Sequence, residues 1–200
     1  MNEKQMQHGK DWQGQDLTGW LLSEKFDGCR AFWDGSRMWS RQGFEIQIPD
    51  AWRSTLPTFA LDGEIFHPAG LVFASNAVRL GGRHFDGCSF IAFDAPDVRG
   101  HWMARLDVAR SFGVRAVEVT VAESTDHAIA MMRAVQDRGG EGLVARHPGL
   151  EYKPGRTARL LKLKTVTPKP VPVRQAPVEP TIAQMKARNW ALACEIIAAI

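Results

Sequence analysis

Residues Leu21–Gly35 read LLSEKFDGCRAFWDG, and the fold prediction starts from this stretch. Two short apolar runs lie on either side of the motif KFDG at 25–28, and each has the length and composition of a strand. The Asp-Gly pair at 34–35 favours a tight turn into a further strand, because glycine tolerates a positive φ. The stretch therefore predicts a strand hairpin with a lysine, Lys25, inside it.

Lys25 has two interpretations. A lysine acts as a nucleophile only when its amine is unprotonated, which requires a pKa lowered by burial or by nearby positive charge. A strand end beside a pocket would hold such a lysine rigidly. An exposed strand lysine before a turn is the alternative, and a KxDG motif by itself does not separate the two, since short motifs match often.

The rest of the first 164 residues predicts a mixture of strands and helices. Strand-length apolar runs bounded by Gly, Pro, Asp or Ser occur at 59–66, 89–95, 115–122, 142–146 and 159–166. Apolar residues at three- and four-residue spacing predict helices at 101–112 and 125–138, each followed by glycine. The basic, glycine-bearing stretch that contains Arg79 and Arg83 is predicted to be a loop.

The composition limits the class of protein. The chain has 200 residues, 44% of them hydrophobic, which suits one medium domain with a small appendage. Its net charge of +3 is compatible with a polyanionic partner. Three cysteines without a CxxC pair argue against a disulfide framework and a structural zinc site. No apolar run approaches the ~20 residues of a membrane span, and the polar start lacks a secretory signal. We expect a cytoplasmic protein with no membrane segment.

The composition of the sequence changes at Thr165. The following segment is proline-rich and without periodicity, so it predicts an extended linker at 166–180. Residues 181–200 have the composition of one terminal helix, with Thr181 as a possible N-cap. The prediction is one domain at 1–165, followed by this linker and this helix.

Five further motifs follow KFDG in a fixed order: SRQG at 40–43, LDGEI at 61–65, FDA at 93–95, EGLVAR at 141–146 and LLKLK at 160–164. In this order they resemble the nucleotidyltransferase domain of ATP-dependent DNA ligases, most of all the small bacterial and viral ones. The resemblance covers Leu21–Lys164. It implies an α+β fold of antiparallel sheets flanked by helices, with a nucleotide pocket between the sheets.

The resemblance implies a three-step reaction. The amine of Lys25 attacks the α-phosphate of ATP and forms a lysyl-AMP; AMP then passes to the 5′-phosphate of nicked double-stranded DNA, and the adjacent 3′-hydroxyl displaces it. Each step is a displacement at phosphorus, so catalysis depends on positioning and on neutralising charge. Lys162 and Lys164 alternate along a strand and point to one face, as two phosphate-binding and catalytic lysines must. We expect them also to lower the pKa of Lys25.

The resemblance also implies the nucleotide and metal contacts. Glu64 is expected near the ribose and the metal, and Glu141 as a metal contact, because oxygen ligands suit Mg²⁺. Phe93 matches the aromatic residue that stacks on adenine. The cofactor-binding set is completed by Glu24, Arg30 and Arg41, of which the two arginines match contacts to nucleotide or DNA phosphate.

The sequence departs from this family in two places. An OB-fold domain usually follows the KLK strand, and the residues after Lys164 are too few to form one. An acidic residue usually lies two positions before the lysine, where this chain has Ser23; Glu24 directly precedes Lys25 and is expected to face away from it. Recognition of adenine must then come from the backbone or from another residue.

Three interpretations of the missing domain stay open. The chain is a minimal, monomeric ligase that grips DNA with its basic face and tail, a relic that binds nicks or accepts AMP slowly, or one half of a pair whose tail recruits a partner. We favour the first, because the predicted terminal helix has the character of a natural end of the chain. The excess of basic over acidic residues in the tail would suit DNA phosphates (Lys169, Arg174, Lys186 and Arg188 against Glu179 and Glu195). The alternatives in function are an RNA ligase, a capping-type guanylyltransferase, or a nick-binding module with little sealing activity. Repair, replication and recombination are all compatible roles.

Overall fold

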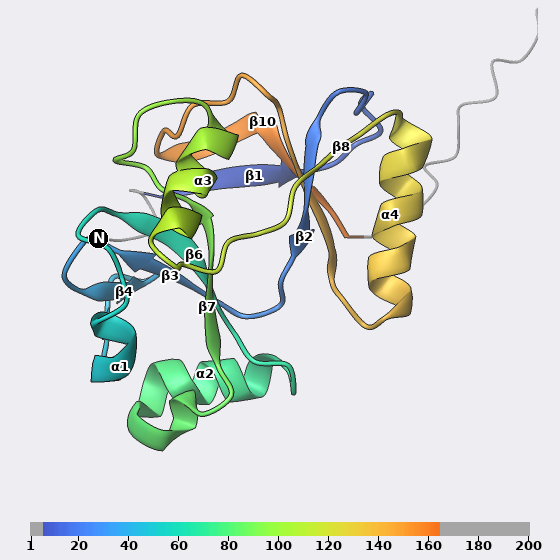
Figure 1. Ribbon diagram of the computed structural model, residues 1–200. Coiled ribbons are helices and arrows are strands. Elements are labelled where there is room, and N and C mark those ends of the chain that lie inside the picture. The colour runs from blue at the N-terminus through green and yellow to red at the C-terminus, as the bar shows by residue number, and fades with distance from the viewer. Residues whose placement is uncertain (1–5, 165–200) are drawn as a thin grey trace, which may run out of the picture. The chain divides into compact units, whose positions relative to one another are not determined.

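The computed structural model describes residues 6–164, which form two five-stranded sheets and the helices packed on them (Figure 1). The first sheet has the strand order β1 (Gln7–Asp11), β10 (Gly155–Leu163), β9 (Gly142–Arg146), β2 (Leu21–Lys25) and β8 (Thr120–Val121). The second has the order β5 (Glu45–Ile46), β4 (Met38–Ser40), β3 (Cys29–Trp33), β6 (Leu61–Phe66) and β7 (Ser89–Asp94). Only β1 and β10 pair in parallel; the other pairs of named strands are antiparallel. The predicted α+β class is confirmed.

The first sheet is covered by helix α4 (Thr125–Asp137). Leu161 and Leu163 alternate along β10 toward the helix, where they meet Met132 in a buried apolar cluster. Ser124 caps the helix by accepting a hydrogen bond from the backbone N–H of His127, at 3.1 Å. The same alternation leaves Lys162 and Lys164 on the opposite face of the strand, so one strand serves both the core and the polar site.

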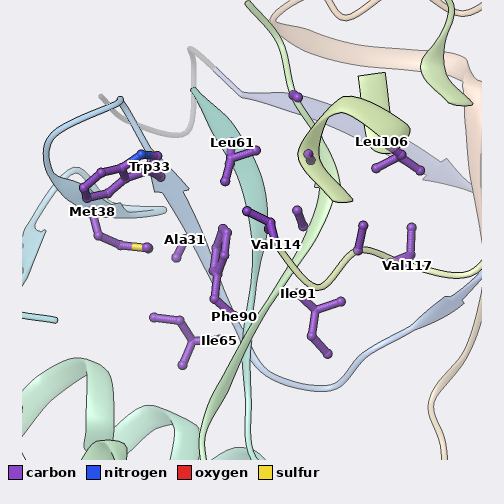
Figure 2. Close-up of a cluster of buried hydrophobic side chains, with 14 of the residues drawn as sticks. Ala31, Trp33, Met38, Leu61, Ile65, Phe90, Ile91, Leu106, Val114 and Val117 are labelled. Carbon is purple, nitrogen blue, oxygen red and sulfur yellow. The ribbon is translucent and has the colours of Figure 1, made fainter. Parts of the chain in front are cut away.

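The second sheet packs against α2 (Leu71–Leu80) and α3 (Trp102–Ser111). Figure 2 shows side chains of β3, β6 and β7 meeting Leu106 of α3 and the segment that holds Val114 and Val117. Trp33, at 2% exposure, uses its indole N–H to bond the carbonyl of Pro57 at 2.6 Å. Two short elements, α1 (Asp50–Arg53) and the 3₁₀ helix η2 (Gly82–Phe85), complete the fold.

The chain passes from one sheet to the other within the opening motif. Strand β2 belongs to the first sheet and β3 to the second, so residues 26–28 form the connection and Lys25 is the last residue before it. Figure 1 shows β2 leading away from its own sheet into this connection. The Asp-Gly turn at 34–35 joins β3 to β4 as predicted, with Gly35 at a φ of 96°.

Three predictions of elements need correction. The stretch with Arg79 and Arg83 is helical rather than a loop, because Ala74 and Ala77 bury one face of α2 in the core. The predicted strand at 115–122 is reduced to Thr120–Val121, since the chain here bonds first to the second sheet at Ala92 and then to the first at β2. Strand β1 was not predicted at all; its residues are polar, and pairing with β10 makes it a strand.

No helix within residues 6–164 is long and apolar enough to cross a bilayer. The predicted linker and terminal helix at 166–200 lie outside the described residues.

Replacing Leu61 by alanine is expected to lower the free energy of unfolding by about 2–5 kcal/mol, because Leu61 has no exposed surface and its loss leaves a cavity under β6. Leu80→Ala is the matched control; its side chain is 64% exposed, and the change should stay within about 0.5 kcal/mol. Chemical denaturation measures both. Equal effects of the two substitutions would contradict the assigned core.

Candidate active site

The connection between the sheets requires a glycine at position 28. A Cβ atom at Gly28 would lie 2.3 Å from the carbonyl oxygen of Ile65 and 2.9 Å from Cγ of Glu64, so no side chain fits. Phe26 packs its ring edge-on against Phe66, with 5.2 Å between the centroids. The exposed Asp27 completes the turn. Strand β6 therefore packs closely against the motif, and Lys25 is fixed at the start of it.

Glu141 binds two lysines at once. One carboxylate oxygen pairs with Nζ of Lys25 and the other with Nζ of Lys164, at 2.8 Å. Burial acts to raise the pKa of Glu141, but the hydrogen bonds from Lys164 and Lys25 outweigh it and hold the pKa below its ordinary value. The hydrogen bond to Glu141 in turn raises the pKa of Lys164. The carboxylate thus gathers two of the predicted cations at one end of β9.

Lys162 lies on the same face of β10 as Lys164, as the alternation predicts, and both line one cavity. Partial burial lowers the pKa of Lys162, and the positive charges of Lys164 and Lys25 act in the same direction against the attraction of Asp11. Three lysines from two strands are therefore close enough to influence one another. Such a concentration of positive charge suits a polyphosphate.

Glu64 lies on β6, opposite Arg30 of β3 in the register of the second sheet. Burial raises the pKa of Glu64 to about 8, although Lys25 and Arg30 both act to lower it. At neutral pH this carboxyl is therefore largely protonated in the free protein. A bound cation would favour its ionised form.

The cavity lies between the two sheets. The first sheet contributes Ser23, Lys25, Val144, Arg146, Leu160 and Lys162, and the second contributes Arg30, Asp62, Glu64 and Phe93. The first sheet also contributes Arg156 and residues of β1, and Tyr152 lines the wall from the segment before β10. The arrangement has an aromatic face, cations at the end near Lys25, and polar groups at its inner end, as a nucleotide site requires.

Arg30 is held by protein groups within this cavity. Its Nε and Nη2 donate to the two carboxylate oxygens of Asp62 at 3.0 and 2.6 Å, and Nη2 also donates to the carbonyl of Gln7 at 2.7 Å. The guanidinium carbon lies 5.3 Å from the ring centroid of Phe93. The hydroxyl of Tyr152 donates to Asp62 at 2.7 Å, and burial raises the pKa of this tyrosine.

The other predicted residues are placed as follows. Arg41 is exposed and lines the cavity. Glu24 also borders it, but its carboxylate pairs with Arg138 at 2.5 Å, beyond the end of α4. Within residues 6–164 no group of three or more His, Cys, Asp or Glu side chains is placed to hold a metal ion by itself.

Sequence reasoning missed several residues of the cavity. Gln7 and His8 come from the unpredicted strand β1, and Tyr152 from the segment before β10. Asp62 and Arg146 lie inside recognised motifs but were given no role. One signal was available, because a charged residue within an apolar strand such as FALDGEIF must find a buried partner.

Replacing Glu64 by glutamine is expected to stabilise the protein more at pH 8 than at pH 5. With a pKa near 8 when folded and 4.5 when unfolded, Glu64 keeps its proton in the folded state while the unfolded chain loses it. Stability therefore falls as pH rises through this window, and glutamine removes that loss, roughly 4 kcal/mol at pH 8. Denaturation curves from pH 5 to 8 measure it, with the exposed Glu118→Gln as control. If Glu64→Gln raised the free energy of unfolding by the same amount from pH 5 to 8, the raised pKa of Glu64 would be contradicted.

Comparisons with known proteins agree with this geometry. No protein-family model matches the chain. A DNA ligase of Haemophilus influenzae is 28% identical over 163 residues, which make up 77% of this chain and 61% of that protein. The chain thus spans about three fifths of the length of this curated relative.

Two solved structures extend the comparison. A Lig E DNA ligase has a TM-score of 0.73 and 25% identity, over 80% of this chain and 68% of that chain. The Chlorella virus DNA ligase-adenylate has a TM-score of 0.67 and 21% identity, over 81% of this chain and 67% of that chain. The resemblance drawn from the motifs is confirmed: residues 6–164 are similar in sequence and in fold to the nucleotidyltransferase domain of DNA ligases.

Proposed function

We propose that this protein is an ATP-dependent DNA ligase that seals nicks in duplex DNA through a covalent lysyl-AMP at Lys25. The observation that carries the proposal is the cluster of Lys25, Lys162, Lys164 and Glu141 at one end of a cavity that has Phe93 on its opposite wall. Several cations around one nucleophilic amine suit attack on a phosphate, where charge must be neutralised. The similarity to DNA ligases supports the choice of reaction.

The first step forms the adenylated enzyme. Nζ of Lys25, after losing a proton, attacks the α-phosphorus of ATP; a P–N bond forms, the bond to the bridging oxygen breaks, and pyrophosphate leaves. Lys162 and Lys164 face the same cavity and would hold the phosphates in line. In the free protein the charge of Lys25 is paired with Glu141, so the amine is released for attack when Glu141 takes another partner.

Glu64 and Glu141 are the residues that would hold Mg²⁺ in our proposal. Two carboxylates, Glu64 and Glu141, fit an ion that is held by one or two carboxylates and otherwise by substrate phosphates and water. The absence of a larger acidic cluster in residues 6–164 agrees with such a metal better than with a site built from protein alone. When bound, Mg²⁺ supplies positive charge to the phosphates.

The remaining contacts follow from the cavity walls. Phe93 is placed to stack on the base, an interaction worth roughly 1–3 kcal/mol. Both Arg41 and Arg30 line the cavity and are candidates for a phosphate contact, and Arg30 also donates to Asp62 and to Gln7. Glu24 lines the cavity and its carboxylate pairs with Arg138, so we assign it to the nucleotide site and not to the metal.

The later steps need nicked DNA at the same lysine. A 5′-phosphate oxygen attacks the phosphorus of the lysyl-AMP and releases Lys25; the 3′-hydroxyl then attacks the 5′-phosphorus, and AMP leaves. Two exposed aromatic side chains are candidates for contacts to the duplex: Phe44 is 74% exposed and follows Arg41 closely, and Phe73 is 50% exposed and stacks on His67. The similar Lig E ligases are described as binding DNA with a minimal scaffold.

Replacing Lys25 by alanine is expected to abolish both the covalent AMP adduct and nick sealing, because no other amine occupies this position. The assay combines labelled ATP, Mg²⁺ and a nicked duplex. Lys153→Ala is the matched control, since Lys153 is 76% exposed and forms an ion pair with Glu151 at the surface. An adduct formed from GTP and not from ATP would favour a guanylyltransferase, and tight nick binding without sealing would favour a binding module.

We further propose that the chain divides into a nucleotidyltransferase domain at 1–165, a linker at 166–180 and a helix at 181–200 that helps to hold DNA. A chain that ends at Thr165 should still form the AMP adduct, whereas its sealing of nicks should fall at least about tenfold, because basic contacts to phosphate are lost. The deficit should shrink as the salt concentration rises, because the truncated chain makes fewer phosphate contacts and its binding depends less on salt. Sealing that is unchanged by the truncation would refute this role of the tail.

A further inference from the structure

Two ion pairs join strand β2 to the loop that carries Glu141. Lys25, the last residue of β2, pairs with Glu141, and the preceding Glu24 pairs with Arg138 at 2.5 Å. Arg138 is the C-cap of helix α4, and Glu141 directly precedes strand β9. The two pairs have opposite polarity, because β2 supplies the cation of one and the anion of the other.

The loop between α4 and β9 is rich in glycine. It contains Gly139, at a φ of 86°, and Gly140, and Gly142 follows at a φ of 147°. Glycine has many accessible backbone conformations, so holding such a loop in one of them has a high entropic cost. The Glu24 carboxylate lies against the loop, since a Cβ atom at Gly140 would be 3.2 Å from its Oε1. Contacts from outside the loop therefore keep Glu141 in one position.

Helix α4 supplies part of that support. The backbone N–H of Gly139 donates to the carbonyl of Gln136 at 2.9 Å. The side-chain amide of Gln136 donates to the carbonyl of Glu141, at 3.4 Å, and also to that of Lys164. The loop is therefore bonded to the end of α4, where Arg138 lies, and a contact that fixes this end also fixes the loop.

The proposed reaction breaks one of the two ion pairs. Lys25 becomes free to attack when Glu141 takes another partner, and the pair of Glu24 with Arg138 then remains between the two segments. Glu141 must nevertheless stay close to Lys25, because the carboxylate and the amine act on the same triphosphate. The second pair is therefore needed most when the first is broken.

We propose that Glu24 and Arg138 are positioning residues that hold Glu141 beside Lys25 during formation of the AMP adduct. This inference rests on the proposed function. It gives Glu24 an indirect part in the reaction, through Arg138 and the loop, in addition to its place in the wall of the cavity. The two side chains are 30% and 57% exposed, so the expected effects are those of a partly exposed ion pair.

The first test needs neither metal nor nucleotide. Nitrogen-15 relaxation of the metal-free protein measures the order parameters of the loop amides, at Gly139, Gly140 and Glu141. They should be about 0.85 in the wild type, as in rigid backbone, and should fall toward about 0.6 in Arg138→Met. Arg133→Met is the matched control, because it removes the charge of another exposed arginine of α4. Equal order in Arg138→Met and the wild type would overturn the proposal.

The second test is a double-mutant cycle on formation of the Lys25 adduct. Glu24→Gln and Arg138→Met should each raise the half-saturating concentration of Mg²⁺ by about two- to fivefold, the factor that corresponds to a partly exposed ion pair. The double variant should be no worse than either single variant, since both remove the same interaction. Arg138→Lys, which keeps the charge, should recover most of the loss.

The cycle also gives the results that would exclude this role. Additive effects of Glu24→Gln and Arg138→Met would mean that the two residues act independently. A half-saturating concentration of Mg²⁺ that neither variant changes would mean that the pair does not position Glu141. Wild-type protein that forms no adduct would refute the proposed function and this role with it, whereas normal adduct formation by Arg138→Met would refute this role alone.

Discussion

Asp62 and Asp94 are fully buried carboxylates, and the arrangement of the two sheets depends on the groups that neutralise them. Both lie in the second sheet, yet Tyr152, Arg146 and the backbone of Gln7, which complete their network, belong to the first sheet or the segments beside it. Removing one partner of a buried ion pair typically costs about 3–5 kcal/mol. A shift of one sheet relative to the other would break these buried pairs and incur this cost. The network therefore holds the two sheets, and the cavity between them, in a fixed arrangement.

Much of the fold follows from local patterns in the sequence. The Asp-Gly turn, the helices α3 and α4 and the alternation of leucine with lysine in LLKLK are properties of neighbouring residues, and the structure has them where expected. Strand β1 is different, because its residues QHGKD have no apolar pattern and become a strand only through β10. Likewise, residues 115–122 contain a strand-like run, but bonding to both sheets in turn breaks it.

The motifs predict which residue types form the site, but they do not predict which of these residues contact one another. The sequence places a lysine, two glutamates and two further lysines in order, but only the register of β9 against β2 and β10 brings Glu141 between Lys25 and Lys164. The engagement of Arg30 by Asp62 likewise depends on β3 lying beside β6. Such contacts join residues far apart in the chain, and short-range periodicity contains no information on them.

The parallel pairing of β1 with β10 has a consequence for folding. Gln7 lies beside Gly155, so nearly the whole described chain must be closed into a loop before this ladder forms. The entropy of loop closure rises with loop length, and contacts between distant residues slow the folding of a domain. Gln7 and His8 complete the cavity wall from this strand. The nucleotide pocket is therefore expected to be among the last parts of the protein to form, after the hairpins of the second sheet have already assembled.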